Sequence, residues 1–190
     1  MKLKDHRLAQ SLQLAYSAER AAAFAYIGHA ASLKNQTEKQ RVKEIEDDEW
    51  DHRAHVLKIM KQYEIPVSRF YEIKYFIIGK IISWSCFIIG RFMPYFFAGK
   101  LESGNVCEYF VMIKKFRDLG IYEHDQILYD MGVKEKEHEE FFLEIASKDS
   151  WMPYFDKIFS WGKNKSQNDV DLNELLPLEK ATEYCKKWER

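Results

Sequence analysis

Residues 42–60, VKEIEDDEWDHRAHVLKIM, carry the pattern on which the expected fold depends. Residues three and four apart fall on one face of an α-helix, and an apolar face of this kind should be turned toward the core. Four of the six positions on this face are apolar, but the two in the middle are Glu49 and His52, in a Glu-x-x-His spacing. The six positions are Val42, Ile45, Glu49, His52, Val56 and Ile59. The stretch therefore predicts a helix that places a carboxylate and an imidazole inside the protein.

The same arrangement recurs later in the chain. Glu135 and His138 each lie 86 residues after Glu49 and His52. Apolar residues again continue the helical face on both sides of the polar pair, at Leu128, Met131, Phe142 and Ile145. Two copies of one arrangement favour a shared role for the four polar residues over a chance occurrence.

Carboxylates in a protein interior require compensation, because burying an ionised group without a partner costs several kcal/mol against a small total stability. Neither of these two helical faces contains a Lys or an Arg. A bound cation is therefore the simplest compensation, and carboxylates with one imidazole per metal suit iron or manganese. The alternative is a polar interior whose groups hydrogen-bond to one another.

Two further glutamates are candidates to complete such a site. Glu19 is an isolated acid in an Ala-rich helix, with small and apolar residues around it at helical spacing. In the third main helix both Glu102 and Glu108 lie on apolar faces. Alignment of residues 16–24, YSAERAAAF, with residues 105–113, NVCEYFVMI, favours Glu108, and Glu102 is the alternative.

The expected fold class is all-α, a four-helix bundle over residues 1–147 followed by a C-terminal tail over residues 148–190. The tail is aromatic at first, then polar, and ends in a short charged helix. A capping box formed by Thr37 and Gln40 is expected to begin the second helix. The main helices are expected over about residues 8–33, 37–63, 100–119 and 122–146.

An apolar passage over residues 75–97 is expected to connect the two helix pairs. Lys80 and Arg91 interrupt it, and a charge at the centre of a bilayer costs about 2.5 to 3.5 kcal/mol on insertion scales. The longest stretch without charge, residues 81–90, is too short to span a hydrocarbon core of about 30 Å. The passage therefore predicts an interfacial or core-buried helix.

Composition narrows the classes of function. The 190 residues include 46% hydrophobic residues and carry a net charge of −1, which gives no general electrostatic case for a nucleic-acid partner. The three cysteines, Cys86, Cys107 and Cys185, include no Cys-x-x-Cys pair and indicate neither a disulfide framework nor a thiolate metal site. With no apolar signal segment at the N-terminus, these features favour a cytoplasmic protein, with peripheral contact at the inner face of a membrane as a further expectation.

The candidate residues together resemble the ligand set of the ferritin-like di-iron and di-manganese carboxylate proteins, in which two helices supply one Glu each and two supply Glu-x-x-His. Within that superfamily the short helices and the apolar connection are most similar to the demethoxyubiquinone hydroxylase family of membrane-associated quinone-modifying enzymes. The family pattern has a His-Tyr after the third-helix glutamate, which ESGNVCEYFVMIKK lacks. The residues that carry the resemblance are Glu19, Glu49, His52, Glu108, Glu135 and His138.

The resemblance implies two iron or manganese ions, with Glu49 and Glu135 bridging them and Glu19 and Glu108 binding one each. It further implies an enzyme that activates O₂ to hydroxylate or oxidise an apolar, quinone-like small molecule, using an external electron donor. A homodimer is a further expectation. The alternatives are an iron-handling or peroxide-scavenging protein of ferritin or rubrerythrin type and a non-catalytic helical interaction module.

Overall fold

A computed structural model describes residues 3–159 and 161 of the chain. All regular secondary structure within these residues is helical, which confirms the all-α prediction. The described residues divide into two compact units, one that ends at Arg91 and one that begins at Phe92. The predicted boundary at residue 147, between a bundle and a tail, stays a prediction.

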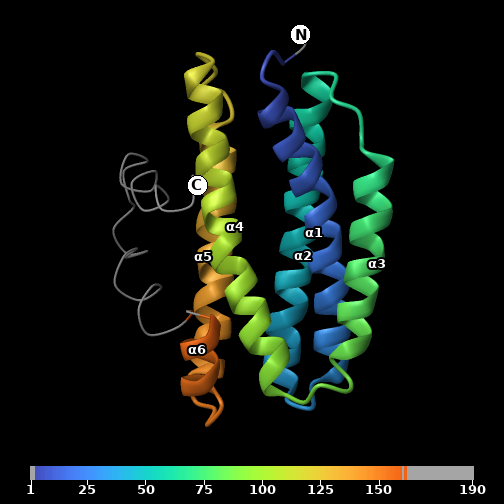
Figure 1. Ribbon diagram of the computed structural model, residues 1–190, viewed down its shortest axis with the longest axis vertical. Coiled ribbons are helices and arrows are strands. Elements are labelled where there is room, and N and C mark those ends of the chain that lie inside the picture. The colour runs from blue at the N-terminus through green and yellow to red at the C-terminus, as the bar shows by residue number, and fades with distance from the viewer. Residues whose placement is uncertain (1–2, 160, 162–190) are drawn as a thin grey trace. The chain divides into compact units, whose positions relative to one another are not determined.

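The first unit contains α1 (His6–Ser32), α2 (Gln36–Gln62) and α3 (Arg69–Ser85). A short turn joins α1 to α2, and α1 packs against both α2 and α3 (Figure 1). The two long helices therefore match the predicted ones to within a few residues. Part of the expected apolar passage is helical as well, and it forms most of α3.

Side-chain caps determine where α1 and α2 begin. Asp5 Oδ1 accepts hydrogen bonds from the backbone N–H groups that open α1. Asn35 Oδ1 accepts from Thr37 N at 2.9 Å and Glu38 N at 3.2 Å, so Asn35 is the N-cap of α2. The prediction of a capping box at Thr37 and Gln40 is wrong, because Asn35 already satisfies the backbone donors of the first turn.

Glycine allows α3 to approach α1 closely. A Cβ atom on Gly79 would lie 2.8 Å from Ala21 Cα and 2.8 Å from Ala21 O. A Cβ atom on Gly28 of α1 would likewise meet the Ser83 carbonyl of α3. Any larger residue at these two positions requires the helices to move apart.

An ion-pair cluster around Glu72 fixes α3 to the other two helices. Arg53 of α2 donates to both Glu72 oxygens at 3.1 and 2.8 Å, and Arg20 of α1 donates to Oε2 at 2.9 Å. Ser17 Oγ adds a bond of 2.9 Å, and Arg53 also donates to the Tyr16 carbonyl. Burial alone would raise the pKa of Glu72, but hydrogen bonds from Arg53 and Ser17 and the charges of the two arginines lower it on balance.

The outward side of α3 is apolar and exposed. We refer to five residues as its outer face, and each is between 50% and 72% exposed: Phe70, Ile73, Ile77, Ile81 and Trp84. Arg69, Lys74 and Lys80 are exposed on the same helix, whereas its acidic residue, Glu72, points inward to the arginines. No helix in the described part of the chain is long and apolar enough to cross a membrane.

The second unit contains α4 (Phe92–Asp118), α5 (Asp125–Ala146) and α6 (Met152–Phe159), and α4 packs along α5 (Figure 1). α4 begins eight residues before the predicted start at residue 100, and Pro94 lies in its first turn, where a proline removes no helical hydrogen bond. Gly120 ends α4 with φ of +75°, and Ile121 N donates back to Phe116 O at 3.0 Å.

The aromatic segment after α5 packs against α4 within the second unit. Lys100 Nζ donates to the Phe159 carbonyl at 2.6 Å, and the Phe155 and Phe159 rings contact Phe96. Trp161 is 2% exposed, and its side chain contacts Gly99, where a Cβ atom would lie 2.4 Å from the indole. The polar stretch and the short charged helix predicted after this segment lie outside the described residues.

A buried polar group accompanies this docking. Lys136 and Glu139 of α5 form an ion pair of 2.9 Å with both side chains 1% exposed. Trp161 Nε1 donates to the other Glu139 oxygen at 2.9 Å. The indole therefore satisfies an acceptor that would otherwise be difficult to bury.

The cysteines differ from the expectation. Cys86 is a free, buried thiol at the end of α3. Cys107 is disulfide-bonded, although the number and spacing of the cysteines indicated no disulfide framework. Cys185 lies outside the described residues.

Candidate metal centre

The first unit brings three predicted ligands together. One ligand atom from each of Glu19, Glu49 and His52 lies within 4.8 Å of the other two. Glu19 comes from α1, and the other two lie one turn apart on α2, so their side chains extend from the same face. None of the three is more than 6% exposed. We refer to these residues as the first triad.

Apolar side chains surround the first triad along the predicted helical faces. All six positions identified from residues 42–60 are buried. On α1 the positions one turn before and after Glu19 are Ala15 and Ala23, both buried, and Tyr26 continues the face. Small side chains beside Glu19 leave room around its carboxylate, and the apolar surroundings keep water away from it.

The second unit contains an equivalent group. One ligand atom from each of Glu102, Glu135 and His138 lies within 4.8 Å of the other two. These side chains are at most 1% exposed, and His138 Nδ1 lies 3.7 Å from Glu135 Oε2. Glu102 comes from α4 and the other two from α5. We refer to these residues as the second triad.

Of the two α4 glutamates, the structure brings Glu102 to the second triad, whereas the sequence alignment favoured Glu108. Glu108 is exposed and does not belong to the second triad, whereas Glu102 is buried and does. The face of Glu102 continues through Val106, Tyr109 and Ile113, which are at most 1% exposed. The face of Glu108 includes Leu101, which is 59% exposed. The geometry therefore replaces Glu108 with the alternative, Glu102, as the α4 candidate.

The electrostatics of the second triad favour a positive partner. Burial raises the pKa of Glu102 well above its ordinary value, and the Glu135 carboxylate and a hydrogen bond with it raise the pKa further. Asn105 Nδ2 acts in the opposite direction by donating to Glu102 Oε2 at 2.8 Å. A metal ion among these oxygens would act in the opposite direction to burial, because its positive charge favours the ionised carboxylate.

Each triad fits a metal ion through the chemistry of its donors. Two carboxylates and one imidazole within ligand distance suit a divalent metal of intermediate hardness, such as iron or manganese. Cysteine, which would favour zinc, is absent from both triads. Both triads can therefore hold a metal ion.

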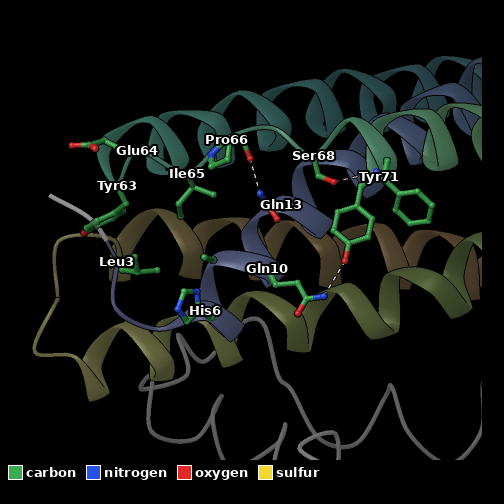
Figure 2. A pocket seen from close by; sticks show the side chains of 12 residues that line it. Leu3, His6, Gln10, Gln13, Tyr63, Glu64, Ile65, Pro66, Ser68 and Tyr71 are labelled. Atoms are coloured by element: carbon green, nitrogen blue, oxygen red, sulfur yellow. Dashed lines mark hydrogen bonds between the residues drawn. The ribbon is translucent and has the colours of Figure 1, made fainter.

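A cavity of about 580 Å³ lies elsewhere in the first unit, between the start of α1 and the α2–α3 connection (Figure 2). Its wall is partly aromatic, from Tyr63, Phe70 and Tyr71. Gln10 donates to the Tyr71 hydroxyl at 2.9 Å, and Gln13 donates to the Pro66 carbonyl at 2.7 Å. These amides therefore hold the α2–α3 connection against α1 and do not belong to either triad.

Sequence reasoning did not identify the arginine cluster around Glu72 or the buried Lys136–Glu139 pair. Glu72 lies on the opposite side of α3 from its outer face, and a lone acid on one side of an apolar helix could have indicated a buried partner for it. The sequence did not indicate that Lys136 is buried, since a lysine beside a glutamate ordinarily lies on a solvated helix surface.

Comparison with known proteins identifies no relative. No family model matches the chain, and neither the curated proteins nor the solved structures include a match.

Proposed function

We propose that this protein is a dinuclear metal oxidoreductase that uses O₂ to hydroxylate or oxidise an apolar small molecule. The observation that carries the proposal is that each unit buries two glutamates and one histidine with their ligand atoms within 4.8 Å. Taken together, the triads match the carboxylate and imidazole set of dinuclear four-helix proteins. Iron is the preferred metal, and manganese suits the same donors.

In this proposal each triad supplies the ligands of one metal position. Glu19 and His52 would serve one ion, and Glu102 and His138 the other. Glu49 would add a second carboxylate to the first position, and Glu135 would add one to the second. When bound, the metal pair supplies the redox chemistry that allows O₂ to react with a C–H bond.

The chain contributes placement and exclusion of water. Helical spacing holds the glutamate and histidine of each Glu-x-x-His pair on one face, and the apolar residues before and after them seal that face from solvent. For a hydroxylation, one oxygen atom enters the substrate C–H bond and the other leaves as water. Two electrons and two protons are then required from an external donor, which is a partner that this proposal includes.

Metal analysis is the first test. After expression in iron-rich medium, the wild-type chain should contain about two iron ions per chain. Glu102→Gln should lower this number, whereas Glu108→Gln, a matched change on the same helix, should leave it unchanged. Fewer than one metal ion per wild-type chain would favour the non-catalytic interaction module.

Oxygen consumption separates the remaining alternatives. Reduced, iron-loaded protein should consume O₂ with an apolar quinone-like compound and yield an oxidised product. Iron that is bound and mineralised in a large assembly, without product, would instead support an iron-handling protein.

We further propose that the outer face of α3 rests on a membrane surface, from which an apolar substrate would be drawn. An exposed apolar face bordered by Arg69, Lys74 and Lys80 is typical of interfacial helices that bind anionic lipid. A second copy of the chain would bring these cations together and is therefore less suitable as the occupant.

Vesicle sedimentation tests this contact. Wild-type protein should sediment with vesicles containing anionic phosphatidylglycerol, and less with vesicles of phosphatidylcholine alone. Ile77→Asp should abolish binding, whereas Ile27→Asp, at a 39% exposed position on α1, should retain it. Equal binding by the two variants would contradict the proposed contact.

A further inference from the structure

Asn105 is joined to a candidate ligand inside the second unit. It lies one turn after Glu102 on α4, and its Nδ2 atom donates to Glu102 Oε2 at 2.8 Å. Glu102 is 1% exposed and Asn105 is half-buried. The bond therefore lies in a region where solvent competes little with it.

The hydrogen bond restricts how Glu102 can present its carboxylate. Oε2 is directed toward the amide of Asn105, and Oε1 takes no part in this contact. With one oxygen held, rotation of the carboxylate about its last side-chain bond is limited. Partners of this kind orient metal ligands, and their removal typically weakens metal binding about 10- to 100-fold.

The chemistry of the donor is suited to such a role. An amide N–H stabilises the charged form of the carboxylate but carries no net charge of its own. A lysine or arginine at the same place would compete with a metal ion for the carboxylate and repel it. Asparagine avoids both effects.

The equivalent position in the first unit is different. The residue one turn after Glu19 on α1 is Ala22, which offers no side-chain donor. The two triads therefore share the same ligand types but differ in this supporting position. A change at Asn105 should consequently affect one metal position and not the other.

We propose that Asn105 is a positioning residue that orients Glu102 for metal binding and strengthens the metal position of the second triad. This inference rests on the proposed function, because it requires that both triads take up metal.

Cobalt(II) titration of the full chain tests the inference, since the visible absorption of bound Co²⁺ reports both affinity and geometry. Asn105→Ala should weaken one of two binding steps about 10- to 100-fold and alter its absorption band, while the other step is unchanged. Gln126→Ala is the matched control, because it removes an exposed amide donor to Asp130 on α5 and should change neither step. Far-UV circular dichroism should show that all three proteins are equally helical.

Asn105→Gln separates the donor from the shape of the side chain. It keeps an amide group and should recover part of the affinity that the alanine variant loses. Equal weakening in the alanine and glutamine variants, or equal weakening of both binding steps, would overturn the role of Asn105 as a specific donor.

The two proposals fail in distinguishable ways. If wild-type protein binds two ions and Asn105→Ala binds them unchanged, the positioning role is wrong and the metal function stands. If wild-type protein binds neither cobalt nor iron, the proposed function is wrong and the positioning role falls with it.

Discussion

Replacement of Glu72 by glutamine tests whether the ion-pair cluster holds α3 on the first unit. The substitution keeps the size of the side chain but removes the negative charge that faces Arg20 and Arg53. The side chains of Glu72 and Arg53 are only 18% and 12% exposed, so water can compensate for the lost charge only in part.

The expected cost follows from this partial burial. Loss of one partner from a fully buried pair costs about 3 to 5 kcal/mol, and hydrogen bonds to charged groups contribute about 1.5 to 3 kcal/mol each. Since the cluster is partly open to solvent, we expect Glu72→Gln to lower the free energy of unfolding by about 2 to 3 kcal/mol. For a chain of this size, that corresponds to a fall in melting temperature of about 5 to 10 °C.

The dependence on pH gives a second check. The folded pKa of Glu72 lies below its ordinary value of 4.5, so its contribution is fully present above that value. As the pH falls through the lowered folded pKa, the carboxylate takes up a proton and the contribution is lost. The difference between wild type and variant should therefore be full at pH 7 and should shrink in acid.

Urea unfolding followed by circular dichroism at pH 7 and at acidic pH measures both effects. The control is Glu44→Gln, because Glu44 is 49% exposed and pairs with Arg41 at 3.4 Å. An exposed pair of this kind should contribute less than about 1 kcal/mol. If Glu72→Gln proved no more destabilising than Glu44→Gln, the view that this cluster fixes α3 would be refuted.

Three further changes probe other contacts. Gly79→Ala should destabilise the chain by about 1 to 3 kcal/mol, because the new methyl group meets the α1 backbone. The control is Gly104→Ala, which should be neutral or slightly stabilising because the space beside Gly104 is open. Thermal melting of the two variants compares these effects. Burial and the charge of Arg91 lower the pKa of His29 to about 3, so the unfolded state takes up a proton first as the pH falls below 6.5. Between pH 7 and 4.5 wild type should consequently lose about 2 to 3 kcal/mol more than His29→Gln in urea titrations, and equal losses would contradict the shift. Trp161→Phe should cost about 1 to 3 kcal/mol, since Glu139 loses a buried donor; an unchanged urea midpoint would show that the indole contact is dispensable.

The helices that carry the triads could be predicted from the sequence because their apolar positions follow a strict three-and-four spacing. That spacing also placed Glu49 and His52 among the buried residues, as the structure has them. The second pair was found by the same route, at Glu135 and His138. Where periodicity was strong, the sequence was therefore sufficient to place these four polar residues in the interior.

The α4 glutamate could not be chosen reliably from the sequence, because both Glu102 and Glu108 lie on apolar faces and the alignment with residues 16–24 favoured Glu108. A longer face, from Ala98 through Glu102 to Ile113, is buried and would have indicated the glutamate that joins the second triad. It was missed because the helix was expected to begin only at about residue 100, whereas α4 begins at Phe92 with Pro94 in its first turn. A proline in the first turn removes no helical hydrogen bond, so it can equally begin a helix.

The outward direction of α3 was equally hard to predict. Apolar residues surround this helix on nearly every side, so periodicity alone did not separate the face against α1 from the exposed one. Two residues distinguish the packed face of α3 from the exposed one. α1 approaches α3 closely at Gly79, and the arginines hold Glu72 inward.

The buried thiol of Cys86 can report how often the last turn of α3 opens. Burial raises its pKa to about 11, so at pH 8 only about one thiol in a thousand is ionised and reactive toward alkylating agents. Its rate of alkylation in native buffer should consequently be controlled by transient opening of the last turn of α3. Compared with the rate for a short unstructured peptide, it reports the population of that opened form. Because Cys86 borders the chain's apolar surface, the same rate measured with and without lipid would show whether a bound membrane suppresses this opening.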